Sequence, residues 1–129
     1  MTAPLVEYPD VVWEVTDYLR TALAAHGYPG IRVADTYKGG ELEVWVQRDG
    51  GPQLDVVRET ARIRINVFAP GTSSQAVDDL ARRVSTLMRA AADGAPILRV
   101  EQTTGPTSIA DTMPRRLLNF EVDVRGTGI

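Results

Sequence analysis

The sequence predicts a two-layer α+β domain, in which two helices cover one face of a mainly antiparallel five-stranded sheet. Three observations support this fold class. Residues 56–69 alternate apolar and polar side chains with a period of two, two other segments carry apolar residues at helical spacing, and Gly- and Pro-rich turns separate the elements. The expected order is α-β-β-β-α-β-β within a single domain spanning residues 1–129.

The segment 56–69, VVRETARIRINVFA, is expected to be the central strand. Its apolar set should face the helices and consists of Ala61, Ile63, Ile65 and Val67. Its polar set should face away and consists of Arg62, Arg64 and Asn66. β-Branched residues at the inward positions suit a packed, pleated surface.

Two helices are expected, one on each side of this strand in the sequence. The first begins at Pro9 and Asp10 and ends near Gly27. Its apolar stripe is Val11, Val15, Tyr18, Leu19, Ala22 and Leu23. The second runs from Thr72, which with Gln75 matches a capping box, to about Ala92. Its inward residues are expected to be Ala76, Val77, Leu80, Val84, Leu87, Met88 and Ala91.

Four further strands complete the predicted sheet. They are expected at residues 31–35, 41–47, 97–102 and 116–125. Turn residues at 49–52 indicate that 41–47 and the central strand form an antiparallel hairpin. Because acidic positions on the neighbouring strands flank Arg62 and Arg64, cross-strand ion pairs are expected on the polar face of the sheet.

Composition narrows the range of functions. The chain has no cysteine, which excludes disulfides and thiolate metal sites and fits folding in a cytoplasm. A net charge of −3, with Lys38 as the only lysine, argues against general nucleic-acid binding. No apolar run approaches membrane-spanning length, and the first ten residues lack the features of a signal peptide, so we expect no membrane association.

Residues that could carry catalysis do not form a recognisable constellation. His26, the only histidine, should lie at a helix C-terminus, and no sequence neighbour could orient it as a general base. Three carboxylate pairs fall on surfaces that should be polar: Asp78 with Asp79, Glu41 with Glu43, and Glu121 with Asp123. The glycines fit turns rather than a phosphate loop. We therefore expect no enzymatic activity, no cofactor and no metal site.

Two tryptophans are expected on faces that should meet water. Trp13 lies opposite the apolar stripe of the first helix, and Trp45 lies on the polar face of its strand beside Glu43. Aromatic residues and arginine are enriched at the cores of protein interfaces. We therefore predict a subunit interface that includes Trp13, Glu43, Trp45, Arg62 and Arg64. The alternative is that the N-terminal leader covers Trp13 and the loop 103–114 covers Trp45.

Residues 103–114, TTGPTSIADTMP, are long for a connection between adjacent strands. Loops of this length are usually functional or disordered. Ile109 and Met113 are apolar residues in a polar run. We therefore expect these two residues to dock on a partner.

Several short patterns occur together in a fixed order. A Pro9-Asp10 helix start precedes a charged hairpin, the strand ending 66–70 (NVFAP) and an Ala/Leu/Arg-rich helix. A Gly105-Pro106 loop, residues 113–116 (MPRR) and a closing strand that ends at Arg125-Gly126 follow. In this order the chain resembles the tail terminator (head–tail joining) proteins of long-tailed, siphovirus-type phages of actinobacteria, over most of its length.

The resemblance implies a non-enzymatic virion protein of the phage neck that is assembled in the host cytoplasm. Such subunits form a homo-hexameric ring that caps the tail tube and ends tail polymerisation. The ring joins the tail tube protein to the head–tail connector or stopper protein and leaves a channel through which DNA passes without sequence-specific binding. The family has no catalytic residues to transfer to this sequence.

Two alternatives remain at this point. The chain could be another neck or tail-completion subunit, which would contact the connector but not the last ring of the tube. It could instead be a small-ligand-binding or enzymatic α+β domain, which would need a concave site with convergent polar groups. The sequence contains no sign of such a site.

Overall fold

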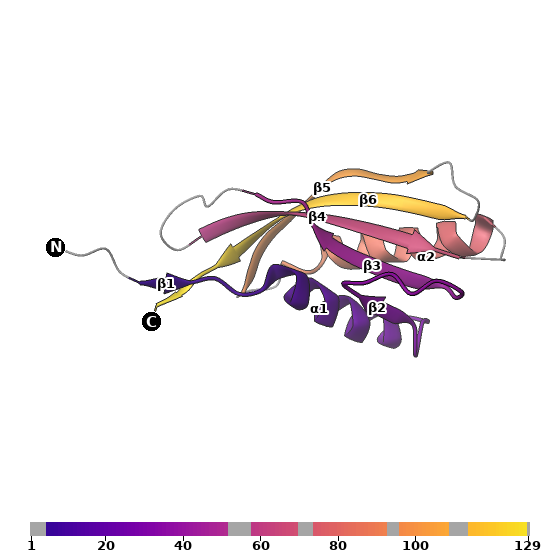
Figure 1. The fold of residues 1–129 in the computed structure, drawn as a ribbon, viewed down its shortest axis with the longest axis horizontal. Coiled ribbons are helices and arrows are strands. Elements are labelled where there is room, and N and C mark those ends of the chain that lie inside the picture. The colour runs from indigo at the N-terminus through magenta and orange to yellow at the C-terminus, as the bar shows by residue number, and fades with distance from the viewer. Residues whose placement is uncertain (1–4, 52–57, 70–73, 93–95, 109–113, 129) are drawn as a thin grey trace.

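The computed structural model describes residues 5–51, 58–69, 74–92, 96–108 and 114–128. Within these ranges the chain forms two helices and two sheets, and the α+β fold class is confirmed (Figure 1). The elements in chain order are β1 (Val6–Glu7), α1 (Val11–Ala25), β2 (Arg32–Ala34), β3 (Glu43–Arg48), β4 (Arg58–Phe68), α2 (Ser74–Arg89), β5 (Ile97–Ser108), β6 (Arg115–Arg125) and β7 (Thr127–Gly128).

The main sheet has the strand order β2-β3-β4-β6-β5, so β4 is central as predicted. The β3–β4 hairpin is antiparallel and pairs Val46 with Ile65. β4 and β6 pair along their whole length, with Ile63 opposite Phe120. The short edge strand β2 is parallel to β3, and the other pairs are antiparallel.

Both helices lie on the same side of the sheet, α1 against β2 and β3 and α2 against β4, β5 and β6 (Figure 1). They also contact each other. The Tyr18 hydroxyl donates to the Leu87 carbonyl at 2.5 Å, and Arg83 donates to the His26 carbonyl at 2.9 Å. Asp10 is the N-cap of α1 and accepts from the Trp13 backbone N–H at 3.1 Å. The helices therefore bring the two halves of the chain together over one core.

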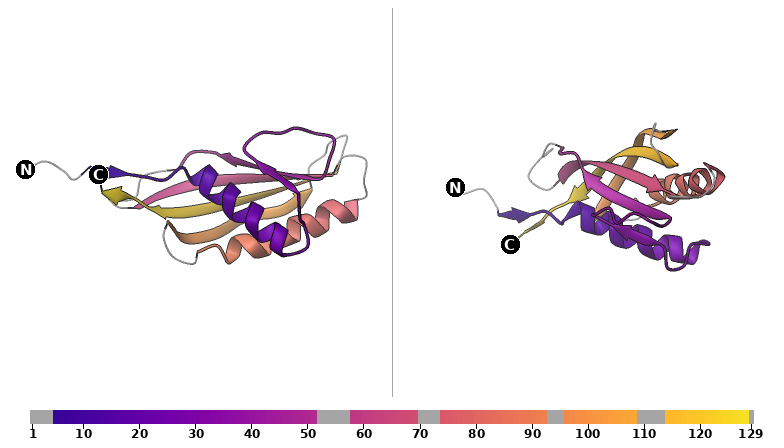
Figure 2. Two further views of the ribbon diagram at one scale, coloured as in Figure 1. Left: turned by 90° about the horizontal axis from the view of Figure 1, so that it is seen from below. Right: turned by 45° about the vertical axis from the view of Figure 1, so that its right-hand side comes forward.

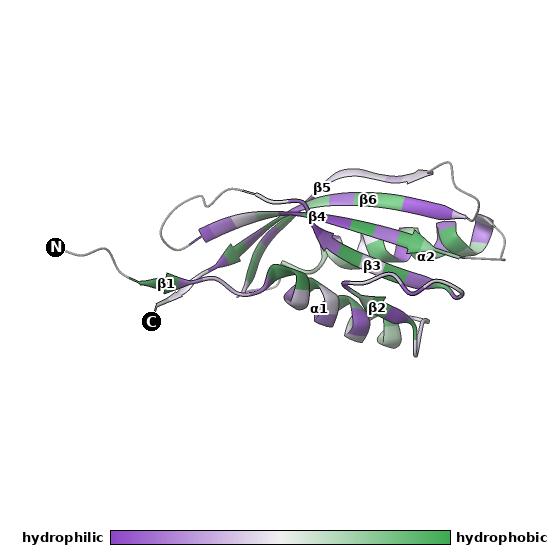
Figure 3. Cartoon of the chain, in the orientation of Figure 1, coloured by the Kyte–Doolittle hydropathy of each residue, from purple (hydrophilic) through white to green (hydrophobic). Residues whose placement is uncertain are grey.

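The core lies between the helices and the sheet. The inward residues predicted for β4 are all buried: Ala61, Ile63, Ile65 and Val67. Apolar and polar residues alternate along β4 and β6, as the hydropathy colouring shows (Figure 3). The apolar side chains thus form the inner face of the sheet, toward the helices, and the polar side chains form the outer face.

Two features differ from the predicted order. β1 and β7 pair as a second antiparallel sheet, and this two-stranded arm extends from one end of the body beside both termini (Figure 2). β5 continues to Ser108, so residues 103–108 are strand rather than loop. Gly105 permits this close pairing, because a Cβ there would lie 2.3 Å from the Leu117 carbonyl oxygen. Register shifts along β5 interrupt the alternation that would have marked a strand.

α2 ends at Arg89, before the predicted end near Ala92. Thr72 lies outside the described residues, so the capping box that it forms with Gln75 stays a prediction. The Gln75 side-chain N–H donates to Asp79 at 2.7 Å. The predicted inward residues Val77, Leu80 and Val84 are buried, which confirms the apolar face of this helix.

Candidate subunit interface

The outer face of the sheet is divided into an aromatic part and a charged part. The aromatic part lies at the β2–β3 end, where residues 35–42 fold back over the strands (Figure 1). The charged part lies on β4, β6 and β5. The sequence predicted one continuous polar face, so the aromatic part is a correction.

The aromatic part is a three-ring cluster. Tyr37 stacks on Trp45 with ring centroids 5.8 Å apart, and it lies 4.4 Å from Phe68. The Arg115 guanidinium covers the other side of Phe68 at 5.2 Å from the ring centroid and donates to the Asn66 side-chain oxygen at 2.8 Å. Phe68 is consequently buried although it points away from the helices.

Trp45 is therefore covered within its own chain, which is a correction to the expectation of a water-facing residue. It is half-buried, and its indole N–H donates to the Asp35 carbonyl at 3.0 Å. Within the described residues, Tyr37 of the segment 35–42 covers Trp45. The packed indole stabilises this segment and leaves less area for contact with another chain.

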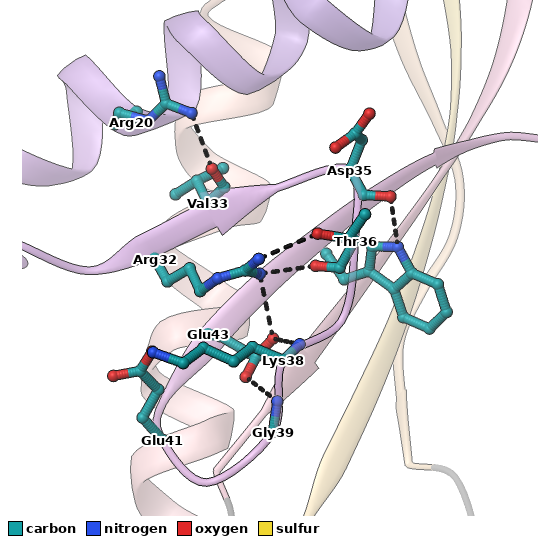
Figure 4. Close-up of polar contacts among 10 residues, drawn as sticks. Arg20, Arg32, Val33, Asp35, Thr36, Lys38, Gly39, Glu41 and Glu43 are labelled. Carbon is teal, nitrogen blue, oxygen red and sulfur yellow. Dashed lines mark hydrogen bonds and ion pairs between the residues drawn. The ribbon is translucent and has the colours of Figure 1, made fainter.

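The prediction that Glu43 belongs to an exposed interface is also wrong, because its side chain is fully buried. Its carboxylate accepts from the backbone N–H groups of Lys38 at 3.0 Å and Gly39 at 2.8 Å, and Arg32 lies 3.5 Å away (Figure 4). The two amides face the carboxylate in a turn where Gly39 has a φ of 81°, a conformation that glycine adopts without strain. Glu43 therefore anchors the 35–42 segment and is not part of an exposed interface.

The charged part contains cross-strand ion pairs, but they are formed by Arg99 of β5 rather than by Arg62 and Arg64 of β4. Arg99 of β5 lies 2.9 Å from Asp123, 2.5 Å from Glu101 and 3.5 Å from Glu121. Thr60 of β4 donates to Asp123 at 2.6 Å. A single guanidinium thus contacts three carboxylates on two strands and offsets part of their charge.

These contacts control the protonation of Asp123, which is buried. Burial alone would raise the pKa of Asp123, but the hydrogen bonds from Arg99 and Thr60 outweigh burial and hold the pKa below its usual value. The hydrogen bonds that Arg99 donates, first to Asp123 and then to Glu101, raise the pKa of Arg99. Both groups remain charged at neutral pH.

Arg62 and Arg64 point to the outer face as predicted, but only one of them has a partner. Arg64 pairs with Asp49 at 2.9 Å. Arg62 is exposed, and its guanidinium has no hydrogen bond or ion pair within the described residues. It lines a shallow hollow of about 220 Å³ together with Asp49, Thr104, Asn119 and Glu121, among others. Arg62 is therefore a cation available to another molecule.

Trp13 is exposed, with 58% of its surface accessible. It lies at the rim of a hollow of about 160 Å³ between the first half of α1 and the end of β2, which we call the α1–β2 hollow. The residues that line this hollow are Asp10, Val12, Trp13, Thr16, Arg20, Ala34 and Asp35. The expected exposure of Trp13 is thus found, and sequence periodicity was sufficient to predict it. The hollow itself could not be predicted, because it requires the packing of α1 beside β2.

The remaining predicted interface residues, Ile109 and Met113, lie outside the described residues. Among the described residues, no cluster of three or more His, Asp or Glu could hold a metal ion. No helix in the described ranges is long and apolar enough to cross a membrane. His26 is exposed at the end of α1, where its carbonyl group, rather than its ring, makes the contact with Arg83.

Comparison with known proteins adds no relative to these observations. No protein-family profile matches the sequence, and no curated protein is significantly similar to it.

Proposed function

We propose that the chain is a structural subunit of a phage neck, a tail terminator that forms a homo-hexameric ring. The ring caps the tail tube, ends its polymerisation and joins it to the head–tail connector, while DNA passes through the central channel. The subunit has no enzymatic activity and needs no cofactor. It belongs to the virion and is assembled in the host cytoplasm.

The observation that carries the proposal is the order of elements and short patterns along the chain. The helix start at Asp10, the β3–β4 hairpin, α2 and the long closing strand β6 follow one another as the resemblance requires. The outer face of the sheet supports the same role, because no helix covers it and it exposes charges of both signs. Such a face suits a repeated contact between identical subunits, which closes into a ring when the rotation allows.

Tail length tests the terminator role. A phage that lacks this chain should assemble overlong tail tubes that do not join heads, because nothing ends their polymerisation. Electron microscopy of lysates from the deletion phage gives the length distribution. Complementation with the intact chain should restore uniform tails. Tails of normal length that still fail to join heads would instead favour a subunit on the connector side of the neck.

A further inference from the structure

The α1–β2 hollow contains an unsatisfied polar group. The Thr16 side chain forms part of its wall, and its hydroxyl is buried without a hydrogen-bond partner among the described residues. Buried hydroxyl groups in folded proteins nearly always have a partner. The hydroxyl is not accessible to a water-sized probe, so a donor in the hollow would reach it only with a small movement of the wall.

The ionisable groups around the hollow favour a cation. Asp10 and Asp35 line it, and the only basic residue in its wall is Arg20, which donates to the Val33 carbonyl at 3.0 Å (Figure 4). The Asp35 carboxylate has no hydrogen bond or ion pair within the described residues and points to the side of the strand on which α1 lies (Figure 4).

The shape of the hollow favours a planar cation. Its volume of about 160 Å³ is close to that of a cavity that holds benzene, roughly 150 Å³. The exposed Trp13 ring at the rim offers a face on which a guanidinium can stack. An arginine side chain combines this stacking with hydrogen bonds to a carboxylate, whereas a lysine presents only a compact charge.

We infer that the α1–β2 hollow is a socket for Arg62 of a second copy of this chain. The contact is head-to-tail, because the socket and Arg62 lie on different surfaces of the subunit. The inference rests on the proposed ring, since a head-to-tail contact repeated around an axis closes a ring of identical subunits.

Arg62 is chosen because its guanidinium makes no hydrogen bond or ion pair within the described residues and lies on the outer face of the central strand β4. The neighbouring carboxylates Asp49 and Glu121 are already engaged by Arg64 at 2.9 Å and Arg99 at 3.5 Å. Arg125 also has no side-chain partner within the described residues, but it lies at the end of β6, in a different hollow beside Glu7 and Glu14. Arg62 therefore supplies the cation, and Arg125 is the matched control.

Charge reversal tests the contact by sedimentation equilibrium over a range of protein concentrations. Asp35→Arg and Arg62→Asp should each weaken self-association by about tenfold or more, because each places like charges together. The double variant should recover most of the association, whereas Arg125→Asp should leave it unchanged. Trp13→Ala should weaken association without lowering the melting temperature by more than a few degrees.

A crosslinking experiment gives a second readout that does not depend on charge. The native chain has no cysteine, so any thiol crosslink must come from introduced residues. The variant with Asp35→Cys and Arg62→Cys should form a ladder of covalent oligomers with a short bis-maleimide, which spans the length of the lost arginine side chain as a disulfide cannot. The variant with Asp35→Cys and Arg125→Cys should not.

The outcomes separate the socket from the proposed function. If the native chain forms rings and the charge reversals or the cysteine pair have no effect, the socket is wrong and the ring remains. If the native chain does not self-associate at any concentration and the cysteine pair gives no ladder, the inference is overturned. The neck role is then tested independently, by the measurement of tail length in the deletion phage.

Discussion

The indole N–H of Trp45 donates a hydrogen bond to the backbone carbonyl of Asp35 at 3.0 Å, which links the outer face of β3 to the segment after β2. The indole also stacks on Tyr37 of that segment. These two contacts position Asp35 beside the α1–β2 hollow. The aromatic cluster on the outer face and the proposed socket are therefore parts of one local structure.

Trp45→Ala should destabilise the folded subunit. The substitution removes the contacts with Tyr37 and Phe68 and leaves the Asp35 carbonyl without its donor. For a half-buried tryptophan we expect a loss of about 2 to 3 kcal/mol in the free energy of unfolding. Trp13→Ala is the control and should cost less than about 0.5 kcal/mol, because Trp13 is exposed. Urea denaturation measures both, and equal effects would contradict this assignment of the two tryptophans.

Glu43→Ala should release the 35–42 segment. The substitution leaves the Lys38 and Gly39 amides without their acceptor, at a cost of about 2 to 3 kcal/mol. Hydrogen exchange at these two amides should accelerate more than exchange in β4. Glu41→Ala is the matched control, since its exposed carboxylate lies 3.7 Å from Lys38 and should contribute little. Unchanged exchange at Lys38 and Gly39 in the Glu43 variant would argue against the anchor.

Acid should destabilise the protein partly through Asp123. Its pKa is lowered in the folded state, so its contribution to stability is complete above the unfolded-state value of 3.8 and is lost as the pH falls through the folded-state value. The free energy of unfolding of the native chain should therefore fall steeply below about pH 4. In Asp123→Asn the value at neutral pH should be lower and its decline in acid shallower. Parallel pH profiles for the two proteins would exclude this role.

Ile65→Ala should lower stability without a specific effect on assembly. Ile65 is fully buried under the helices, and truncation leaves a cavity that costs roughly 2 to 5 kcal/mol. Arg64→Ala removes only a surface ion pair with Asp49 and should cost less than about 1 kcal/mol. Thermal melting compares the two variants. A similar loss of stability in both would mean that the inner and outer faces of β4 are assigned wrongly.

Much of the fold could be predicted from local patterns. The period of two around Ile65 and the helical stripe around Leu19 each identified a buried face, because one side of each element is covered by the core. Turn chemistry at residues 49–52 predicted the β3–β4 hairpin, which is antiparallel. Charges at polar strand positions predicted cross-strand ion pairs on this face, although the pairs form at Arg99 and not at Arg62 and Arg64.

Features that depend on distant segments could not be predicted. Glu43 alternates like a solvent-facing residue, and only the folding of residues 35–42 over β3 buries it. The same segment covers Trp45, and nothing in the periodicity of β3 indicates this. The β1–β7 arm pairs the two ends of the chain through strands of two residues each, too short for a periodic signal. The second half of β5 was missed for another reason, because register shifts in its pairing with β6 interrupt the alternation of its side chains.

A three-dimensional reconstruction of the phage particle that carries this chain is the decisive measurement for the terminator role. We expect six copies in one ring between the last layer of the tail tube and the head–tail connector, with the outer face of each subunit against its neighbour. Density for the chain outside the neck, or a ring with another number of subunits, would contradict it.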